Sequence, residues 1–402
     1  MEKPVAAIEI STKQIKLVVG YVLEDQVFVL YTLCKPISGL VNNGKIIDPE
    51  TLAKEIANIV DIYDGQAKLK IKIEEVLLVL PPCGLAIFQS QNMTNVVSDE
   101  IKVSSIDISN LYAIIKNGKL PVENVLIDIV PFTFLLDNNR IFSQPPIGET
   151  SRTVKVNARV HTLPPTVSDG YFATMRFAGL RMIHSMIAPF ASSTLLDSYQ
   201  ETPSDYFLVD VGSNLTSVSL IGKKQLFSSR TFSFGGDNIT KRIATEFAIS
   251  ENDAEHLKIL YGIENREFNF KAPISTSESE DGTIIKHYPD ELNVIIKSEL
   301  DEFIRTLKST IEELLEGYDS KYKKLPLIFI GGGSLLNGFV KYVEPKIDND
   351  VVYSAIPKTL GARNPGLFNC LGAILVHDRY PVTVDDNQPK IGVVSRKVNN
   401  EE

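Results

Sequence analysis

Two stretches about two hundred residues apart carry the same short pattern of acidic, hydroxyl and glycine residues. Glu9 ends an apolar run, and the residues after it include Ser11, Thr12 and Lys16. Asp210 also ends an apolar run, and the residues after it include Gly212, Ser213, Asn214 and Thr216. Carboxylates hold metal ions, directly or through water, and successive backbone N–H groups in turns bind phosphate. Two such turns facing each other predict a clamp for a phosphate chain and its metal.

Two further glycine turns follow in the second half of the chain. Gly235 and Gly236 precede Asp237 at the start of a predicted helix, and an apolar run at 328–330 leads into Gly331, Gly332, Gly333 and Ser334. Each turn alone also fits a tight connection with no ligand, and each acid alone also fits a turn carboxylate that bonds its own backbone. The ordered set of four turns favours a nucleotide site.

Apolar periodicity predicts strands at 5–10, 15–22, 27–34 and 76–80 and a helix from Asp48 to about residue 63, with Pro49 in its first turn. The wholly apolar strand 76–80 indicates a sheet covered on both faces. Prolines at 81–82 and 164–165 enclose an α+β insertion, with a helix at 105–116 and strands at 122–130, 132–136 and 154–160. Beyond it we expect helices ending at 178 and covering 189–199, 237–247, 250–261 and 292–315, strands at 180–187 and 226–234, and a mobile loop at 275–282.

Composition excludes several classes of protein. A net charge of −9 over 402 residues, without a basic stripe, argues against a nucleic-acid binder. Three dispersed cysteines give neither a disulfide framework nor zinc spacing, and the five histidines show no metal-ligand spacing. No signal peptide and no apolar run of roughly 18 to 20 residues is visible, so we expect a cytoplasmic protein.

Taken together, these motifs resemble the actin-like ATPase superfamily and, within it, the FtsA family of bacterial cell-division proteins. The segment from Val130-Pro131-Phe132 to Pro145-Pro146-Ile147-Gly148 resembles the insertion that this family carries in place of actin subdomain 1B. The resemblance implies an α/β fold of two duplicated ribonuclease H-like domains with an inserted α+β, SHS2-like subdomain. It also implies boundaries at 1–81 (subdomain 1A), 82–165 (inserted 1C), 166–200 (1A), 201–235 (2A), 236–320 (2B), 321–360 (2A), 361–382 (1A) and 383–402 (a polar, disordered tail).

The same resemblance assigns ATP and Mg²⁺ as cofactors. The residues implied to bind the nucleotide are Ser11, Thr12, Lys16, Asp210, Gly212, Ser213, Asn214, Thr216, Gly235, Gly236, Glu255, Lys258, Gly331, Gly332, Gly333 and Ser334. Glu9 and Asp210 are implied to hold the metal through water. The first turn departs from the family's usual Asp-Ile-Gly-Thr, because Glu9 lengthens the acid and Ser11 replaces glycine where a positive φ would be disfavoured. No base for water is nominated, so we expect binding and at most weak ATPase activity.

In the family, such proteins polymerise and tether filaments of FtsZ to the cytoplasmic membrane. We therefore expect self-assembly, FtsZ as partner, no nucleic acid, and a peripheral position at the inner face of the membrane at the division site. The tail from Asp385 to Glu402 lacks the family's amphipathic helix, so either the sequence is shortened or the membrane is reached differently. Two alternatives remain: an adaptor like PilM of pilus assembly, and a small-metabolite kinase of the same superfamily.

Overall fold

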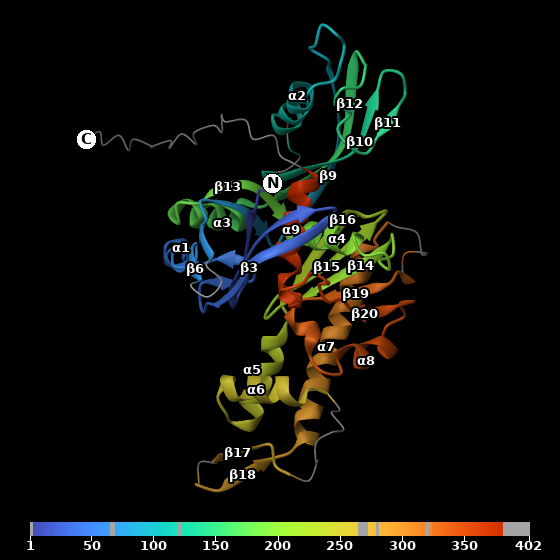
Figure 1. The fold of residues 1–402 in the computed structure, drawn as a ribbon. Helices are drawn as coiled ribbons and strands as arrows, with labels where there is room; N and C mark the ends of the chain where they lie inside the picture. Colours follow the sequence, from blue (N-terminus) through green and yellow to red (C-terminus); the bar gives the residue numbers. More distant parts are fainter. Residues whose placement is uncertain are drawn as a thin grey trace, which may run out of the picture.

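The computed structural model describes residues 3–380, except 65–68, 119, 121–122, 264–271, 279–280, 318–321 and 323. Two five-stranded sheets form the body, and a four-stranded module projects from one end of it (Figure 1). The tail predicted at 383–402 lies outside the described residues. Among the described residues, no helix has both the length and the apolar character to cross a bilayer.

The first sheet has the strand order β13-β8-β1-β2-β3. β1 and β2 pair antiparallel, as do β2 and β3, whereas β1, β8 and β13 run parallel. β8 is buried almost throughout, as its unbroken apolar sequence predicts. The bounds are Val5–Ile10 for β1, Gln14–Leu23 for β2, Gln26–Pro36 for β3, Glu75–Leu80 for β8 and Arg181–Ile187 for β13.

The second sheet repeats this topology, with the order β16-β15-β14-β19-β20. β14 to β16 form an antiparallel meander, and β14, β19 and β20 run parallel. The duplicated α/β fold implied by the resemblance is thereby confirmed. The bounds are Tyr206–Val211 for β14, Thr216–Gly222 for β15, Gln225–Phe232 for β16, Leu327–Ile330 for β19 and Val352–Ser354 for β20.

Helices cover the sheets and join the two halves. α4 (Ala188–Asp197) packs against strands of both sheets, and α9 (Phe368–Arg379) packs on α4 and on the first sheet. One buried apolar cluster therefore includes residues of both halves. On the far face of the second sheet a separate core forms beneath α7 (Pro289–Leu314). The other helices are α1 (Pro49–Ala57), α3 (Pro165–Phe177), α5 (Gly236–Phe247), α6 (Glu251–Tyr261) and α8 (Phe339–Val343).

The projecting module has the strand order β11-β10-β12-β9, with α2 against the sheet. It is anchored to both halves. His184 of the first half lies 3.2 Å (Nε2 to Oδ1) from Asp128 of the module. Arg159 of the module donates to Gln225 at 3.0 Å and places its guanidinium 3.9 Å from the Phe227 ring centre, both on β16. The bounds are Ala86–Asn95 for β9, Ser105–Lys116 for α2, Val125–Leu136 for β10, Ile141–Phe142 for β11 and Thr153–Leu163 for β12.

Some sequence expectations were wrong in detail. The helix expected to reach residue 63 ends at Ala57, because β6 (Asp61–Asp64) pairs with β7 (Leu69–Lys72). The strands expected at 122–130 and 132–136 form one strand, β10, with a register shift at Pro131. The loop expected at 275–282 contains a strand, β17 (Ser275–Glu278), that pairs with β18 (Ile284–His287). The smaller elements are β4 (Val41–Asn42), β5 (Lys45–Ile46) and the 3₁₀ turns Gly332–Leu335, Glu344–Lys346 and Pro365–Leu367.

Candidate functional site

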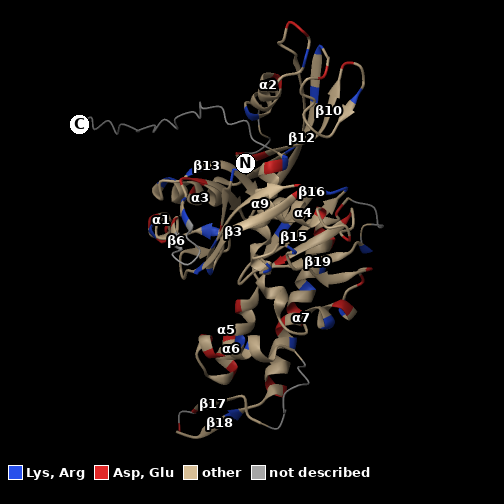
Figure 2. Cartoon of the chain, in the orientation of Figure 1, with Lys and Arg blue, Asp and Glu red and all other residues tan. Residues whose placement is uncertain are grey.

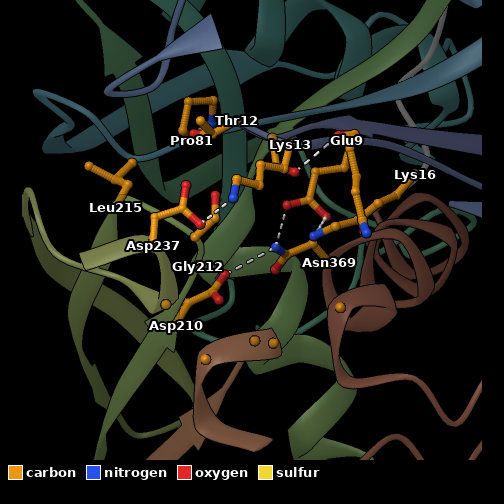
Figure 3. Close-up of a pocket in the computed structure, with 18 of the residues that line it drawn as sticks. Glu9, Thr12, Lys13, Lys16, Pro81, Asp210, Gly212, Leu215, Asp237 and Asn369 are labelled. Carbon is orange, nitrogen blue, oxygen red and sulfur yellow. Dashed lines mark hydrogen bonds and ion pairs between the residues drawn. The ribbon is translucent and has the colours of Figure 1, made fainter. Parts of the chain in front are cut away.

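A cavity of about 550 Å³ lies where the turns after β1, β14 and β19 meet. The start of α5 and one face of α6 complete its wall, together with Pro81 and Pro82 after β8. Figure 2 shows that acidic and basic residues are dispersed over the chain, whereas Figure 3 shows both kinds within this cavity. The duplicated topology explains the meeting, since equivalent strand ends of the two halves face each other.

In the turn after β1, Ser11 closes the loop with its own side chain. Its backbone N–H and its Oγ both donate to the carbonyl oxygen of Gln14, at 2.9 and 3.0 Å. Ser11 is not among the described residues with positive φ. The expected conflict between serine and a left-handed backbone is therefore absent here.

The turn after β14 is held by its own backbone and by the start of α5. Gly212 donates to the carbonyl of Leu215 at 3.0 Å, and Gly236 donates to the carbonyl of Gly212 at 3.0 Å. A Cβ at Gly235 would lie 2.4 Å from the carbonyl of Ser213, so only glycine fits there. Thr216 is fully buried and donates to the Phe234 carbonyl at 2.8 Å. Gly235 and Thr216 thus shape this turn without lining the cavity.

The two predicted metal acids lie close together across the cavity (Figure 3). One nitrogen, Nδ2 of Asn369, lies 2.9 Å from Glu9 Oε1 and 3.2 Å from Asp210 Oδ2. Lys16 Nζ lies 3.2 Å from Glu9 Oε2. Burial and the Glu9 charge raise the pKa of Asp210, while Lys16 and the Asn369 bond oppose that rise. Burial lowers the pKa of Lys16, but the charges of Glu9 and Asp210 outweigh burial and raise it.

The turn after β19 fits against the second acid through a glycine. Gly331 has φ +84°, and a Cβ there would lie 2.3 Å from Asp210 Oδ1. A side chain at 331 would therefore be strained and would displace the acid. Gly332 by contrast faces open space, and Gly333 rests on Val211. Ser334 lies outside the cavity lining and donates to the Gly331 carbonyl at 2.8 Å.

On α6, Glu255 and Lys258 form a bonded pair at the cavity wall. Lys258 Nζ lies 2.7 Å from Glu255 Oε2 and also donates to Thr240 Oγ1 and the Gly236 carbonyl at 2.9 and 3.1 Å. Burial raises the pKa of Glu255, but its bonds to Lys258 and Thr240 outweigh burial and lower it. Ile259 and Leu335, both more than half exposed, add apolar surface beside this pair.

Besides the Asn369–Asp210 bond, two contacts cross the cavity between the halves. Thr12 Oγ1 donates to Asn214 Oδ1 at 2.6 Å, and Lys13 Nζ pairs with Asp237 Oδ1 at 2.6 Å. We call these two contacts the cross-cleft latch. Asn214 therefore meets the first turn rather than the cavity itself.

The structure brings most of the predicted site residues to one cavity, and it adds residues that the sequence motifs did not indicate. Lys13 lies within the first motif, and Asp237 follows the glycine pair at the start of α5, but neither is among the predicted site residues. Asn369 lies far along the chain from either acid, at the start of α9, and no local pattern marks it. In the described part of the chain, His, Cys, Asp and Glu side chains form no group of three placed to hold a metal ion. Only two acids, Glu9 and Asp210, are predicted to hold the metal, so a metal bound there would need further ligands from water or phosphate.

Two sheets of identical topology, packed about shared helices with three turns meeting in one cavity, define an actin-like fold. Solved structures agree on the fold. The PilM-PilN type IV pilus biogenesis complex matches with a TM-score of 0.60 and 19% identity, covering 93% of this chain and 98% of that chain. MreB5 of Spiroplasma citri bound to AMPPNP matches with a TM-score of 0.53 and 13% identity, covering 94% and 96%.

Sequence comparison then identifies the relatives. The family model for cell division protein FtsA matches residues 207–372. FtsA of Enterococcus faecalis is 25% identical over 371 residues, which are 91% of this chain and 82% of that protein. FtsA of Neisseria meningitidis is 20% identical over 404 residues, covering 98% and 95%. The chain is therefore similar in sequence to the cell division protein FtsA over most of its length.

Proposed function

We propose that this protein is a cell-division scaffold that binds ATP with Mg²⁺ in the cavity between its halves and polymerises. The observation that carries the proposal is the convergence of Glu9 and Asp210, from equivalent strands of the two halves, on one cavity lined by glycine turns. The MreB5 neighbour, of the same fold, was solved with AMPPNP.

The residues present fit a nucleotide and its metal. The turns after β1 and β14, with Lys16, would hold the phosphates, since they offer backbone N–H groups and one partly buried ammonium. Gly331 to Gly333, with Glu255 and Lys258, would lie beside the nucleoside. Glu9 and Asp210 would hold Mg²⁺ through water. The metal, when bound, neutralises phosphate charge, and the chain's residues orient the phosphates about it.

Nucleotide would act through the equilibrium between open and closed forms of the cleft. A ligand that contacts both halves binds the closed form better and shifts the population towards it. If the closed form assembles better, nucleotide and assembly are linked reciprocally. We propose that the resulting filaments link FtsZ filaments to the inner face of the cytoplasmic membrane at the division site. We also propose the subdomain boundaries and the SHS2-like nature of the module given by the sequence.

Replacing Asp210 by Ala tests the cleft assignment. Loss of one of two metal acids should weaken binding of MgATP roughly tenfold or more, measured by isothermal titration calorimetry. The matched control is Asp169→Ala, because Asp169 is exposed and lies outside the cavity. Equal affinity of the Asp210 variant and the unchanged protein would disprove the assignment.

A pelleting assay with lipid vesicles, ATP and FtsZ tests the scaffold role. We expect this protein to carry FtsZ into the vesicle pellet and to do so better with ATP. The PilM-like alternative is supported by similarity of fold, since the TM-score to the PilM-PilN complex is 0.60. This alternative predicts binding to a short N-terminal peptide of a membrane protein. FtsZ left in the supernatant, together with such peptide binding, would favour the adaptor. ATP turnover that rises sharply with one sugar or acid would favour the kinase.

A further inference from the structure

The side chain of Asn369 is built into the centre of the cavity. It is 3% exposed and lies in the first turn of α9. Its Nδ2 donates to Glu9 of the first half and Asp210 of the second, at 2.9 and 3.2 Å. One amide nitrogen has two hydrogens, so these two bonds use its full donor capacity.

The orientation of the Asn369 amide is determined by its hydrogen-bond partners. Ser192 of α4 is fully buried and donates its hydroxyl to Asn369 Oδ1. The reversed orientation would set the carbonyl oxygen against two carboxylates, which can only accept when ionised. The amide nitrogen must therefore face the acids.

The packing of α9 on α4 makes this contact possible. Gly372 lies one turn after Asn369, and a Cβ there would be 2.0 Å from the carbonyl oxygen of Ala191. The absence of a side chain at 372 lets the two helices approach until Ser192 reaches Asn369. Asn369, Gly372 and Ser192 thus act as one unit that presents the amide to the cavity.

Two carboxylates bonded to the same nitrogen lie within two hydrogen-bond lengths of each other. Like charges so close repel, and among the described residues only Glu9 of the two has an ammonium partner within 4 Å, through Lys16 on its other oxygen. A donor between the acids keeps them together without occupying a ligand position, because a carboxamide N–H does not coordinate Mg²⁺.

We propose that Asn369 is a positioning residue that sets the separation of the two metal acids across the cleft. In this role Asn369 compensates for the longer side chain of Glu9. Because it bonds an acid from each half, it also links closure of the two halves to binding of the metal. This inference rests on the proposed function. Asn369 touches neither phosphate nor metal in this scheme and acts through Glu9 and Asp210.

The test measures ATP affinity by calorimetry with Mg²⁺ and with EDTA in its place. In the Asn369→Ala variant we expect the enhancement of binding by Mg²⁺ to fall roughly tenfold, since bonds to charged groups are lost, while binding in EDTA changes little. Asn157→Ala, in the module, is the matched control and should retain the full enhancement. Ser192→Ala, which frees the amide without altering a cavity-lining residue, should give a smaller loss in the same direction.

A length exchange gives a second readout. Glu9→Asp shortens one arm of the contact by a methylene, and Asn369→Gln lengthens the other. Each single variant should lose Mg²⁺ enhancement, and the double variant should recover at least half of the loss on a logarithmic scale. Circular dichroism and melting of each variant verify folding.

The outcomes separate the two proposals. Absence of MgATP binding in the unchanged protein would contradict the proposed function. Binding in the unchanged protein with equal losses of Asn369→Ala in Mg²⁺ and in EDTA, or a double variant no better than its singles, would overturn only the role of Asn369.

Discussion

Asp197, at the end of α4, is a partly buried acid whose Oδ1 has no hydrogen-bond partner among the described residues. Burial raises its pKa to about 7, although Lys224 and Arg379 oppose the rise. The pKa of an aspartate in an unfolded chain is about 3.9. The folded form therefore holds this proton more tightly than the unfolded form.

The stability due to this proton is fully present below pH about 4 and is lost as the pH rises through about 7. Asp197→Asn should remove that loss and stabilise the protein by ~1–2 kcal/mol at pH 8 relative to the unchanged chain, a figure reduced for partial exposure. Urea unfolding at pH 5 and pH 8 measures this difference in the free energy of unfolding between the variant and the unchanged chain. Asp169→Asn, at an exposed site, is the control, and an equal gain in both variants would refute the assignment.

At the scale of elements, the packing of α9 on α4 reverses the usual preference for alanine over glycine inside a helix. Alanine is normally favoured over glycine within a helix by about 1 kcal/mol. At Gly372 the added Cβ would meet the Ala191 carbonyl at 2.0 Å. The Gly372→Ala variant should therefore have a lower melting temperature, which differential scanning calorimetry measures.

Since the clash at Gly372 is with backbone, a second change of Ala191 to Gly should not restore the melting temperature. Recovery in that double variant would mean that the helices are held apart by side chains instead.

Local sequence signals predicted elements whose caps are local. α2 covers the expected 105–116 because Ser104 and Asp107 form a capping box at its start. The hairpin β17–β18 was missed because β17 is wholly polar and because the two isoleucines of β18, Ile284 and Ile285, are adjacent and exposed, so no apolar alternation marks it. β9 was missed for a related reason, since its side chains alternate without a strong apolar face. Asn369 could not be found locally, because its partners Glu9, Asp210 and Ser192 come from three other elements.

At the scale of the whole molecule, the cross-cleft latch holds the halves together without nucleotide. Thr12–Asn214 and Lys13–Asp237 are the two contacts, each worth on the order of 1 kcal/mol. The double variant Thr12→Val, Lys13→Ala should favour the open form. Small-angle scattering should show a larger radius of gyration than for the unchanged protein when nucleotide is absent.

Adding MgATP to that latch variant should reduce the radius of gyration again, because a nucleotide that contacts both halves favours the closed form. The control is Lys341→Ala, at an exposed position away from the cleft. A radius of gyration unaffected by loss of the latch would show that the latch does not determine the closure.

The two anchors of the module have a mechanical consequence. His184–Asp128 ties the module to one half, and the stack of Arg159 on Phe227 ties it to the other. Any hinge motion that separates the halves must tilt the module or break one anchor (Figure 1). Opening of the cleft would therefore displace the far end of the module. A partner protein bound at that end would respond to the opening of the cleft, and a force applied there would favour the open form.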